Sequence, residues 1–225
     1  MKIAGLQKLT LLDYPDHLAC IVFTQGCNFN CGFCHNSGLI DYKRPTSIRE
    51  EELFEFLNKR KGILTGVVIS GGEPTIQSDL KEFIEKIKRL GYAVKLDTNG
   101  SNPKVIKELI DDALVDYIAM DIKHTFDNYS VVTGCKVDIK RIENSIKEVK
   151  RIAHEFRTTL IKDVHDIDCI SSICSLIGID ETLYLQNFTM SDLVRDKNLT
   201  GFTNKELKEI QNILNEKYPN VRVRS

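Results

Sequence analysis

Three cysteines that stand close together are the residues in this chain best suited to chemistry. Cys27, Cys31 and Cys34 lie in the segment FTQGCNFNCGFCHNSG, with three residues between the first pair and two between the second. A structural zinc site normally has four protein ligands. Three thiolates with no obvious fourth ligand instead suit a 4Fe-4S cluster, in which each cysteine binds a different iron and one iron stays open to another ligand.

Two other interpretations of the triplet stay open at this point. The three thiols could bind zinc with the adjacent His35 as a fourth ligand, or they could be buried without binding a metal. Zinc sites usually contain pairs of close cysteines rather than one triplet, which favours the cluster.

The other cysteines are scattered along the chain, and we expect them to be structural. The total of seven is odd, and together with an expected cytosolic location this disfavours a disulfide framework. These cysteines are Cys20, Cys135, Cys169 and Cys174. No motif makes ligands of His35, His124 and His165, which we expect to be hydrogen-bonded polar residues.

Charge and hydropathy exclude several classes of partner. The chain has 31 Lys and Arg residues against 32 Asp and Glu residues, so its net charge is close to zero. This balance gives no electrostatic reason to expect nucleic acid or a membrane surface as the main partner. The first residues do not form a signal-peptide pattern, and no apolar run is long enough to span a bilayer. We therefore expect a cytoplasmic protein without a membrane anchor.

Short apolar runs alternate with amphipathic segments along most of the chain. A capping box of Ser47 and Glu50 is expected to begin the first helix. Apolar strands between amphipathic helices indicate a parallel sheet covered by helices. The predicted strands are 18–26, 66–70, 92–98, 116–122, 157–162 and 182–187, and the predicted helices are 47–62, 78–91, 103–112, 139–153, 167–178 and 203–218.

Polar and special residues gather where these predicted strands end, which favours a barrel over an open sheet. In a (β/α) barrel the carboxyl ends of the strands build the active site. Eight units would need a longer chain, so we expect an α/β fold of the partial (β/α)6 TIM-like barrel type. The expected organisation is a single domain over residues 1–225, with an N-terminal extension at 1–17 and six βα units at 18–218.

A second motif, GGEP at Gly71, Gly72, Glu73 and Pro74, follows the second predicted strand. Glycines allow main-chain groups to approach a ligand closely, and proline stiffens the turn. Alone the motif indicates only a turn. Together with the cysteine triplet and the aromatic Phe33 before its third cysteine, it resembles the radical S-adenosylmethionine (SAM) superfamily.

That resemblance implies the partial barrel, one 4Fe-4S cluster and S-adenosyl-L-methionine, with GGEP at the methionine amino group. The implied chemistry is reductive cleavage of SAM to methionine and a 5′-deoxyadenosyl radical, which then abstracts a hydrogen atom.

Further segments resemble the activases of glycyl radical enzymes. CHN at 34–36, LDTNG at 96–100 and MDIK at 120–123 match the activase pattern, and the opening LTLLDYPDHLACIVFTQGCNFNC resembles the activating proteins of anaerobic ribonucleoside-triphosphate reductase. The implied partners are such a reductase, whose glycine would lose a hydrogen atom, and a flavodoxin or ferredoxin as electron donor. No cysteine stands between residue 36 and GGEP, so a single cluster is expected.

The resemblance also implies roles for residues at the ends of the third and fourth predicted strands. Asp97 and Thr98, with Asp121, match positions around the SAM carboxylate, where a monovalent cation is expected. Lys123 matches a residue that neutralises this carboxylate.

Five further positions are carried over from the activases. Asn36 and Arg157 match residues near bound SAM, although Arg157 could equally form a surface salt bridge. Gln186 and Asn187 stand where other activases have a histidine near the ribose, so their role is open. Asp13 matches an acidic residue that contacts the partner's glycine loop, and it could instead cap a turn.

Rival functions remain at this stage. The chain could be a radical SAM enzyme that acts on a small molecule, similar to a deazaguanine synthase, or an activase of a different glycyl radical enzyme. A zinc-binding module without redox chemistry is the third alternative.

Overall fold

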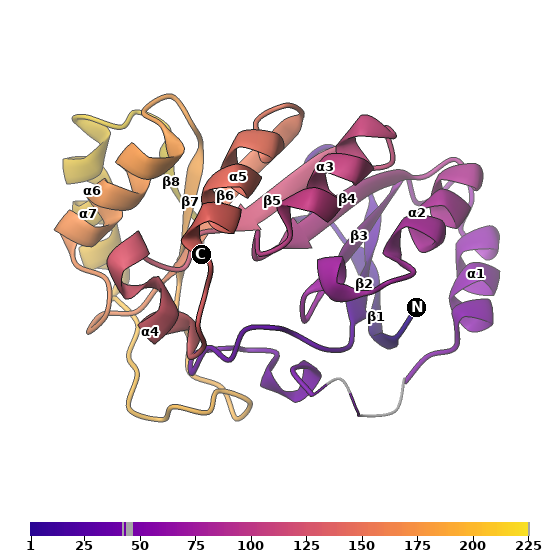
Figure 1. Ribbon diagram of the computed structural model, residues 1–225, viewed down its shortest axis with the longest axis horizontal. Helices are drawn as coiled ribbons and strands as arrows, with labels where there is room; N and C mark the ends of the chain where they lie inside the picture. The colour runs from indigo at the N-terminus through magenta and orange to yellow at the C-terminus, as the bar shows by residue number, and fades with distance from the viewer. Residues whose placement is uncertain (42, 44–46, 225) are drawn as a thin grey trace. The chain divides into compact units, whose positions relative to one another are not determined.

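The computed structural model describes residues 1–41, 43 and 47–224, which form two compact units (Figure 1). The first unit comprises Met1–Asn28, Gly38–Ala119 and Arg141–His154, and the second comprises Phe29–Ser37, Met120–Lys140 and Glu155–Ser225. The cysteine triplet is shared, with Cys27 in the first unit and the other two cysteines in the second.

The first unit contains a sheet whose neighbouring strands follow one another in the sequence. Strand β1 pairs with β2 in antiparallel fashion, whereas β2–β3 and β3–β4 are parallel pairs. The expected N-terminal extension thus contains a strand that the sequence analysis missed. Residues 11–18 connect β1 to β2, which is too few for the long crossover that parallel neighbours need and suits an antiparallel pair. The strands are β1 (Ile3–Thr10), β2 (Ala19–Thr24), β3 (Gly66–Gly71) and β4 (Ala93–Thr98).

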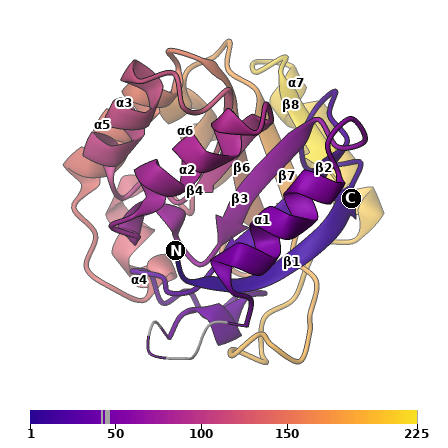
Figure 2. The same cartoon turned by 90° about the vertical axis from the view of Figure 1, so that its right-hand side faces the viewer.

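Helices connect the parallel strands, as predicted. Figures 1 and 2 show α1 and α2 on the same side of β3. The helices are α1 (Glu50–Lys59), α2 (Leu80–Arg89), α3 (Pro103–Asp111) and most of α5 (Ile139–Val149), with the short 3-10 turns η1 (Ser37–Leu39) and η2 (Pro74–Ile76).

The predicted capping box at the start of α1 is wrong. The helix begins at Glu50 after Arg49, whose side chain makes no capping hydrogen bond. Ser47 lies outside the helix, where its N–H donates to the carbonyl of Ile3 at 3.0 Å. Three consecutive glutamates in the first turn stabilise the start of the helix instead, because their negative charges lie near the positive end of the helix dipole.

The parallel strands of this unit are apolar at successive positions because they are covered on both faces. Ala19, Ile21 and Val68 form one cluster with Tyr14. Cys20 points to the opposite face, since neighbouring residues of a strand alternate. It is fully buried, which raises the pKa of its thiol to about 12.

The second unit holds a parallel arrangement of β6, β7 and β8. Strand β8 was not predicted, nor was α4, while α6 and α7 match predicted helices. Thr203 and Glu206 form a complete capping box at the start of α7. The elements are β6 (Ala153–Leu160), β7 (Leu183–Asn187), β8 (Val221–Arg224), η3 (Phe126–Asn128), α4 (Tyr129–Thr133), α6 (Ile167–Ile177) and α7 (Asn204–Asn215); β5 (Tyr117–Asp121) ends in this unit.

Two of the scattered cysteines lie in α6. Cys169 and Cys174 are both buried, as expected for structural residues, and burial raises the pKa of each thiol to about 11. None of the helices in the described part of the chain could cross a membrane.

Candidate active site

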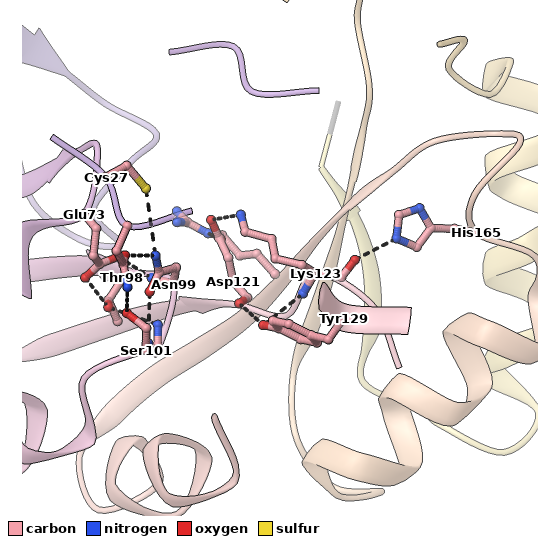
Figure 3. Close-up of polar contacts among 12 residues, drawn as sticks. Cys27, Glu73, Thr98, Asn99, Ser101, Asp121, Lys123, Tyr129 and His165 are labelled. Atoms are coloured by element: carbon pink, nitrogen blue, oxygen red, sulfur yellow. Dashed lines mark hydrogen bonds and ion pairs between the residues drawn. The ribbon is translucent and has the colours of Figure 1, made fainter. Parts of the chain in front are cut away.

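The turn after β3 contains a buried carboxylate, that of Glu73, which accepts hydrogen bonds from neighbouring residues. Glu73 is 1% exposed, and its oxygens accept hydrogen bonds from Thr75 N and Oγ1 at 3.1 and 2.5 Å. Thr98 Oγ1 and Asn99 N donate to it at 2.7 Å each (Figure 3). Burial raises the pKa of Glu73, and these hydrogen bonds oppose that rise. The side chain therefore joins the ends of β3 and β4.

The two glycines of GGEP make room for the start of the cysteine loop. A Cβ on Gly71 would lie 2.3 Å from the amide nitrogen of Thr24, and one on Gly72 would lie 1.9 Å from the carbonyl oxygen of Gly26. Glu73 N donates to this same carbonyl at 2.8 Å. The sequence analysis expected these glycines to make space for a ligand, whereas here they let the turn reach the backbone directly before Cys27.

Asn99 is a functional candidate that the sequence analysis missed. Its Nδ2 lies 4.0 Å from Cys27 Sγ and donates to Asn28 Oδ1 at 3.0 Å, while Ser101 N donates to its Oδ1 at 2.9 Å (Figure 3). The amide is thus held beside a predicted cluster ligand. Hydrogen bonds to ligand sulfur are among the factors that set the potential of iron–sulfur clusters. The available signal was the position of Asn99 directly after a strand.

Asp97 has a partner on its own strand. Lys95 Nζ lies 2.5 Å from Asp97 Oδ1, and the two side chains are 1% and 12% exposed. Residues two apart in a strand share a face, so both project from the same side of β4.

In the second unit, one carboxylate binds two cations. Asp121 accepts from Lys123 Nζ at 2.9 Å and from Arg157 Nε at 2.8 Å. Burial alone would raise the pKa of Asp121, but the two cations hold it well below its usual range. Arg157 does form a salt bridge, as its alternative interpretation expected, but with a buried side chain rather than at the surface. The group carries two positive charges and one negative charge, which suits an anionic ligand.

The backbone of Lys123 is fixed on both sides by buried rings. Lys123 N donates to the Tyr129 hydroxyl at 3.3 Å, and His165 Nε2 lies 3.0 Å from the Lys123 carbonyl (Figure 3). Ile161 N donates to His165 Nδ1 at 3.2 Å, so the neutral ring with its proton on Nε2 satisfies both contacts. Burial lowers the pKa of His165. The expectation that His165 is a hydrogen-bonded polar residue is confirmed.

Cys31 and Phe33 are buried close to the charge of Lys123. Lys123 Nζ lies 5.9 Å from the centre of the Phe33 ring. Burial raises the pKa of the Cys31 thiol, and the charge of Lys123 opposes this rise. A nearby cation favours the thiolate form that an iron ligand must have. Cys34 follows in a tight turn, with its N–H 3.3 Å from the Cys31 carbonyl.

A segment between β7 and α7 holds the cysteine loop from the other end of the sequence. Arg195 donates to Asn30 Oδ1 at 2.6 Å and to the carbonyls of Asn30 and Cys31 at 2.7 and 3.0 Å. The amides of Arg195 and Asp196 both lie 3.2 Å from the carbonyl of Gly32. These five contacts fix the backbone that carries the second cysteine.

His35 is engaged by the same segment rather than by the thiols. Its Nε2 lies 2.7 Å from the carbonyl of Thr189, and its ring stacks on Phe188 at 5.5 Å. Within the described residues, no three Cys, His, Asp or Glu side chains converge as ligands of one metal ion. This geometry gives no support to the zinc alternative. None of the three cysteines is in a disulfide, and the loop that carries Cys31 is held by hydrogen bonds, which fits a cluster whose cysteines bind separate irons.

Two of the remaining predicted positions, Asn187 and Asp13, have local partners. Asn187 exchanges hydrogen bonds with the backbone of Phe202 at 2.7 and 2.9 Å, which is a structural role. Gln186 and Asn36 are partly exposed. Asp13 accepts from Thr10 Oγ1, and its N–H lies 3.2 Å from the same oxygen, so it does stabilise the turn after β1.

Comparisons with known proteins agree with these features. Residues 21–171 match the profile of the radical SAM superfamily. The chain is 33% identical to a candidate glycyl-radical enzyme activating enzyme of Methanocaldococcus jannaschii, over 99% of this chain and 95% of that one. It is 30% identical to the pyruvate formate-lyase-activating enzyme of Clostridium pasteurianum, over 59% and 57% of the two chains.

A solved structure supports the fold. SuiB of Streptococcus suis bound to S-adenosylmethionine matches with a TM-score of 0.66 at 15% identity, over 89% of this chain and 48% of that chain. This likeness confirms the predicted α/β fold with a parallel sheet, of the partial-barrel type.

Proposed function

The chain belongs to the radical SAM superfamily, and from this premise we propose that it activates anaerobic ribonucleoside-triphosphate reductase. It is a radical SAM enzyme of the activase type, with a 4Fe-4S cluster and SAM as its cofactors. The observation that carries the proposal is the likeness over nearly the full length of both chains to the Methanocaldococcus protein named for glycyl radical enzyme activation. The choice of the reductase rests on the resemblance of the opening segment, LTLLDYPDHLACIVFTQGCNFNC.

The residues of this chain fit the cofactors that the family uses. Cys27, Cys31 and Cys34 would hold three irons of the cluster. When bound and reduced by a flavodoxin or ferredoxin, the cluster would supply the electron for reductive cleavage of SAM, with methionine and 5′-deoxyadenosine as products. The hydrogen atom gained by 5′-deoxyadenosine would come from a glycine Cα of the partner, which would keep the unpaired electron.

The charged groups of the chain would orient SAM. The Asp121 group has one net positive charge, since Lys123 and Arg157 together outweigh one carboxylate. We assign Lys123 and Arg157 to the methionine carboxylate of SAM. His165 and Tyr129 would fix the Lys123 backbone so that its ammonium group keeps its position.

An anaerobic activation assay tests the proposal. Reconstituted protein, SAM, a reductant and the candidate reductase are mixed, and the glycyl radical is detected by electron paramagnetic resonance. We expect a radical signal with the reductase and none with a Cys31→Ala variant. Pyruvate formate-lyase serves as the second partner. If only pyruvate formate-lyase gives a radical signal, that enzyme and not the reductase is the partner. If SAM is cleaved but neither enzyme acquires a radical, a small-molecule substrate is favoured.

Asp13 is proposed to contact the glycine loop of the partner in addition to stabilising its own turn. Asp13→Asn keeps a side-chain acceptor for Thr10 but removes the charge. We expect SAM cleavage without partner to be unchanged and the ratio of glycyl radical to cleaved SAM to fall. An unchanged ratio would leave Asp13 with the structural role alone.

A further inference from the structure

The face of β6 that carries Arg157 also carries a buried carboxylate that none of the motifs includes. Glu155 is 1% exposed and stands two positions before Arg157, so both side chains point to one face of the sheet. Arg224 of β8 binds this carboxylate with both ends of its guanidinium group, at 2.9 Å to each oxygen. All three residues belong to the second unit.

The strand register brings Arg224 to the same face as Arg157. Tyr184 of β7 lies beside Arg157, and Gln186, two positions further on, lies beside Arg224. The guanidinium carbon of Arg224 lies 3.8 Å from the centre of the Tyr184 ring, which is a cation–π contact. A ring and a carboxylate thus hold Arg224 in place.

Arg157 lies between two carboxylates of this unit. Glu155 stands two positions before it on the same face, and its own Nε donates to Asp121 at 2.8 Å. Burial lowers the pKa of Arg224 and its bond to Glu155 raises it above the usual range, while the positive charge of Arg157 opposes that rise. A buried carboxylate is strongly disfavoured unless it is paired, so Glu155 and Asp121 both attract Arg157.

We propose that Arg224 is a positioning residue for SAM binding: it holds the negative charge of Glu155, so that the guanidinium group of Arg157 stays at Asp121 for the carboxylate of SAM. The inference rests on the proposed function, because it takes Arg157 to bind SAM. It holds whatever other contacts Glu155 and Arg157 make. Without Arg224, the carboxylate of Glu155 loses one positive charge and two hydrogen bonds, and its attraction for Arg157 rises.

Replacement of Arg224 by methionine tests the inference. The iron-loaded proteins are titrated with SAM by anaerobic calorimetry at about pH 8, which favours the charged form of Glu155. Methionine keeps an apolar chain against Tyr184 but removes the charge and the hydrogen bonds. We expect the SAM affinity of Arg224→Met to be lower than that of the wild type by about tenfold or more, because Arg157 is drawn from Asp121 toward Glu155.

A second change at Glu155 should reverse this loss. The double variant Arg224→Met with Glu155→Gln lacks the charge that attracts Arg157, so we expect its SAM affinity to lie within about threefold of the wild type. A merely structural role of the Arg224–Glu155 pair predicts the opposite. The double variant also lacks the ion pair, and it would then bind SAM no better than Arg224→Met does.

Two single variants complete the set. Glu155→Gln leaves an amide oxygen for Arg224 and should bind SAM no more weakly than the wild type. Arg222→Met is the matched control, because it removes an exposed arginine of the same strand that donates to the carbonyls of Pro219 and Val221; it should bind SAM as the wild type does. Urea unfolding of the iron-free proteins shows which variants are folded.

Two results would overturn the inference and leave the proposed function intact. One is an Arg224→Met protein that binds SAM as the wild type does, and the other is a folded double variant whose affinity stays about tenfold low. If Arg224→Met does not fold, the variants with Glu155→Gln decide instead: normal SAM binding supports the inference, and binding weaker by about tenfold overturns it. A wild type that binds no SAM would refute the proposed function, and the inference with it.

Discussion

Replacing Glu73 tests whether the carboxylate of GGEP serves the protein or the ligand. The structure gives this side chain four donors and almost no exposure. We therefore expect Glu73→Gln and Glu73→Ala to act first on folding stability. Loss of SAM binding should follow from disorder of the turn rather than from a lost ligand contact.

The cost of each change follows from which oxygen receives which donor. Oε1 accepts three hydrogen bonds, and Oε2 accepts that of Asn99 N. In Glu73→Gln the amide oxygen can still accept the same three hydrogen bonds. The NH2 group then faces the N–H of Asn99, and two donors cannot form a hydrogen bond with each other. Losing one charge-assisted bond costs about 1.5–3 kcal/mol. Because burial raises the pKa of Glu73, removal of the charge offsets part of this loss, and we expect about 2 kcal/mol.

Glu73→Ala should lower the free energy of unfolding more than Glu73→Gln does. Thr75 N and Asn99 N are backbone donors that cannot turn toward another acceptor, and each unsatisfied buried group costs about 1–3 kcal/mol. Adding the cavity left by the side chain gives roughly 3–6 kcal/mol, which is a large part of the 5–15 kcal/mol that stabilises a typical domain.

Urea unfolding of the iron-free proteins and SAM binding to the reconstituted ones measure the two effects separately. Glu52→Gln is the matched control, since it removes an exposed carboxylate that pairs with Arg49, and it should change stability by less than about 1 kcal/mol. A Glu73→Gln protein as stable as the wild type but unable to bind SAM would refute the reasoning, because the carboxylate would then act on the ligand.

The other predictions concern Gly72, His165 and Arg195, the last of which donates hydrogen bonds to the cysteine loop. Gly72→Ala should reduce both stability and iron content, measured by urea unfolding and iron analysis, because its Cβ would meet the Gly26 carbonyl at 1.9 Å; normal iron content would contradict this. Burial lowers the pKa of His165, so the wild type should lose stability as the pH falls below about 6.5, where the unfolded chain takes up a proton that the folded chain resists. His165→Gln should remove this part of the pH dependence of the urea midpoint, and an unchanged slope would exclude His165 as its source. Arg195→Ala should speed the loss of iron under oxygen several-fold, which is followed by absorbance. Arg222→Ala should not, because this side chain donates to the nearby carbonyls of Pro219 and Val221.

The parallel strands and their helices could be predicted because a strand that is buried on both faces must consist of consecutive apolar residues. Strands β1 and β8 could not be predicted in this way. Gln7, Lys8 and Leu9 of β1 are exposed, and β8 reads VRVR, with its two arginines at alternate positions. Such strands are held by backbone pairing with one neighbour and need no continuous apolar sequence.

The site shows a similar division. The motifs identified Asp97, Asp121 and Lys123 by type and position, but their partners are set by tertiary structure. Arg157 reaches Asp121 from a strand 36 residues away, and Arg195 reaches Asn30 across 165 residues. Lys95 was the exception that the sequence could have revealed: a lysine inside an apolar strand needs an anion, and Asp97 stands two positions further on the same face.

Glu73, Asp97 and Asp121 have different partners, and the partners of Asp121 favour a place for the carboxylate of SAM. Glu73 accepts hydrogen bonds from neutral donors, and Asp97 is paired with Lys95. In the second unit, Asp121 is paired with both Lys123 and Arg157. Two cations at one carboxylate suit an anionic ligand, so the carboxylate of SAM should bind at Lys123 and Arg157.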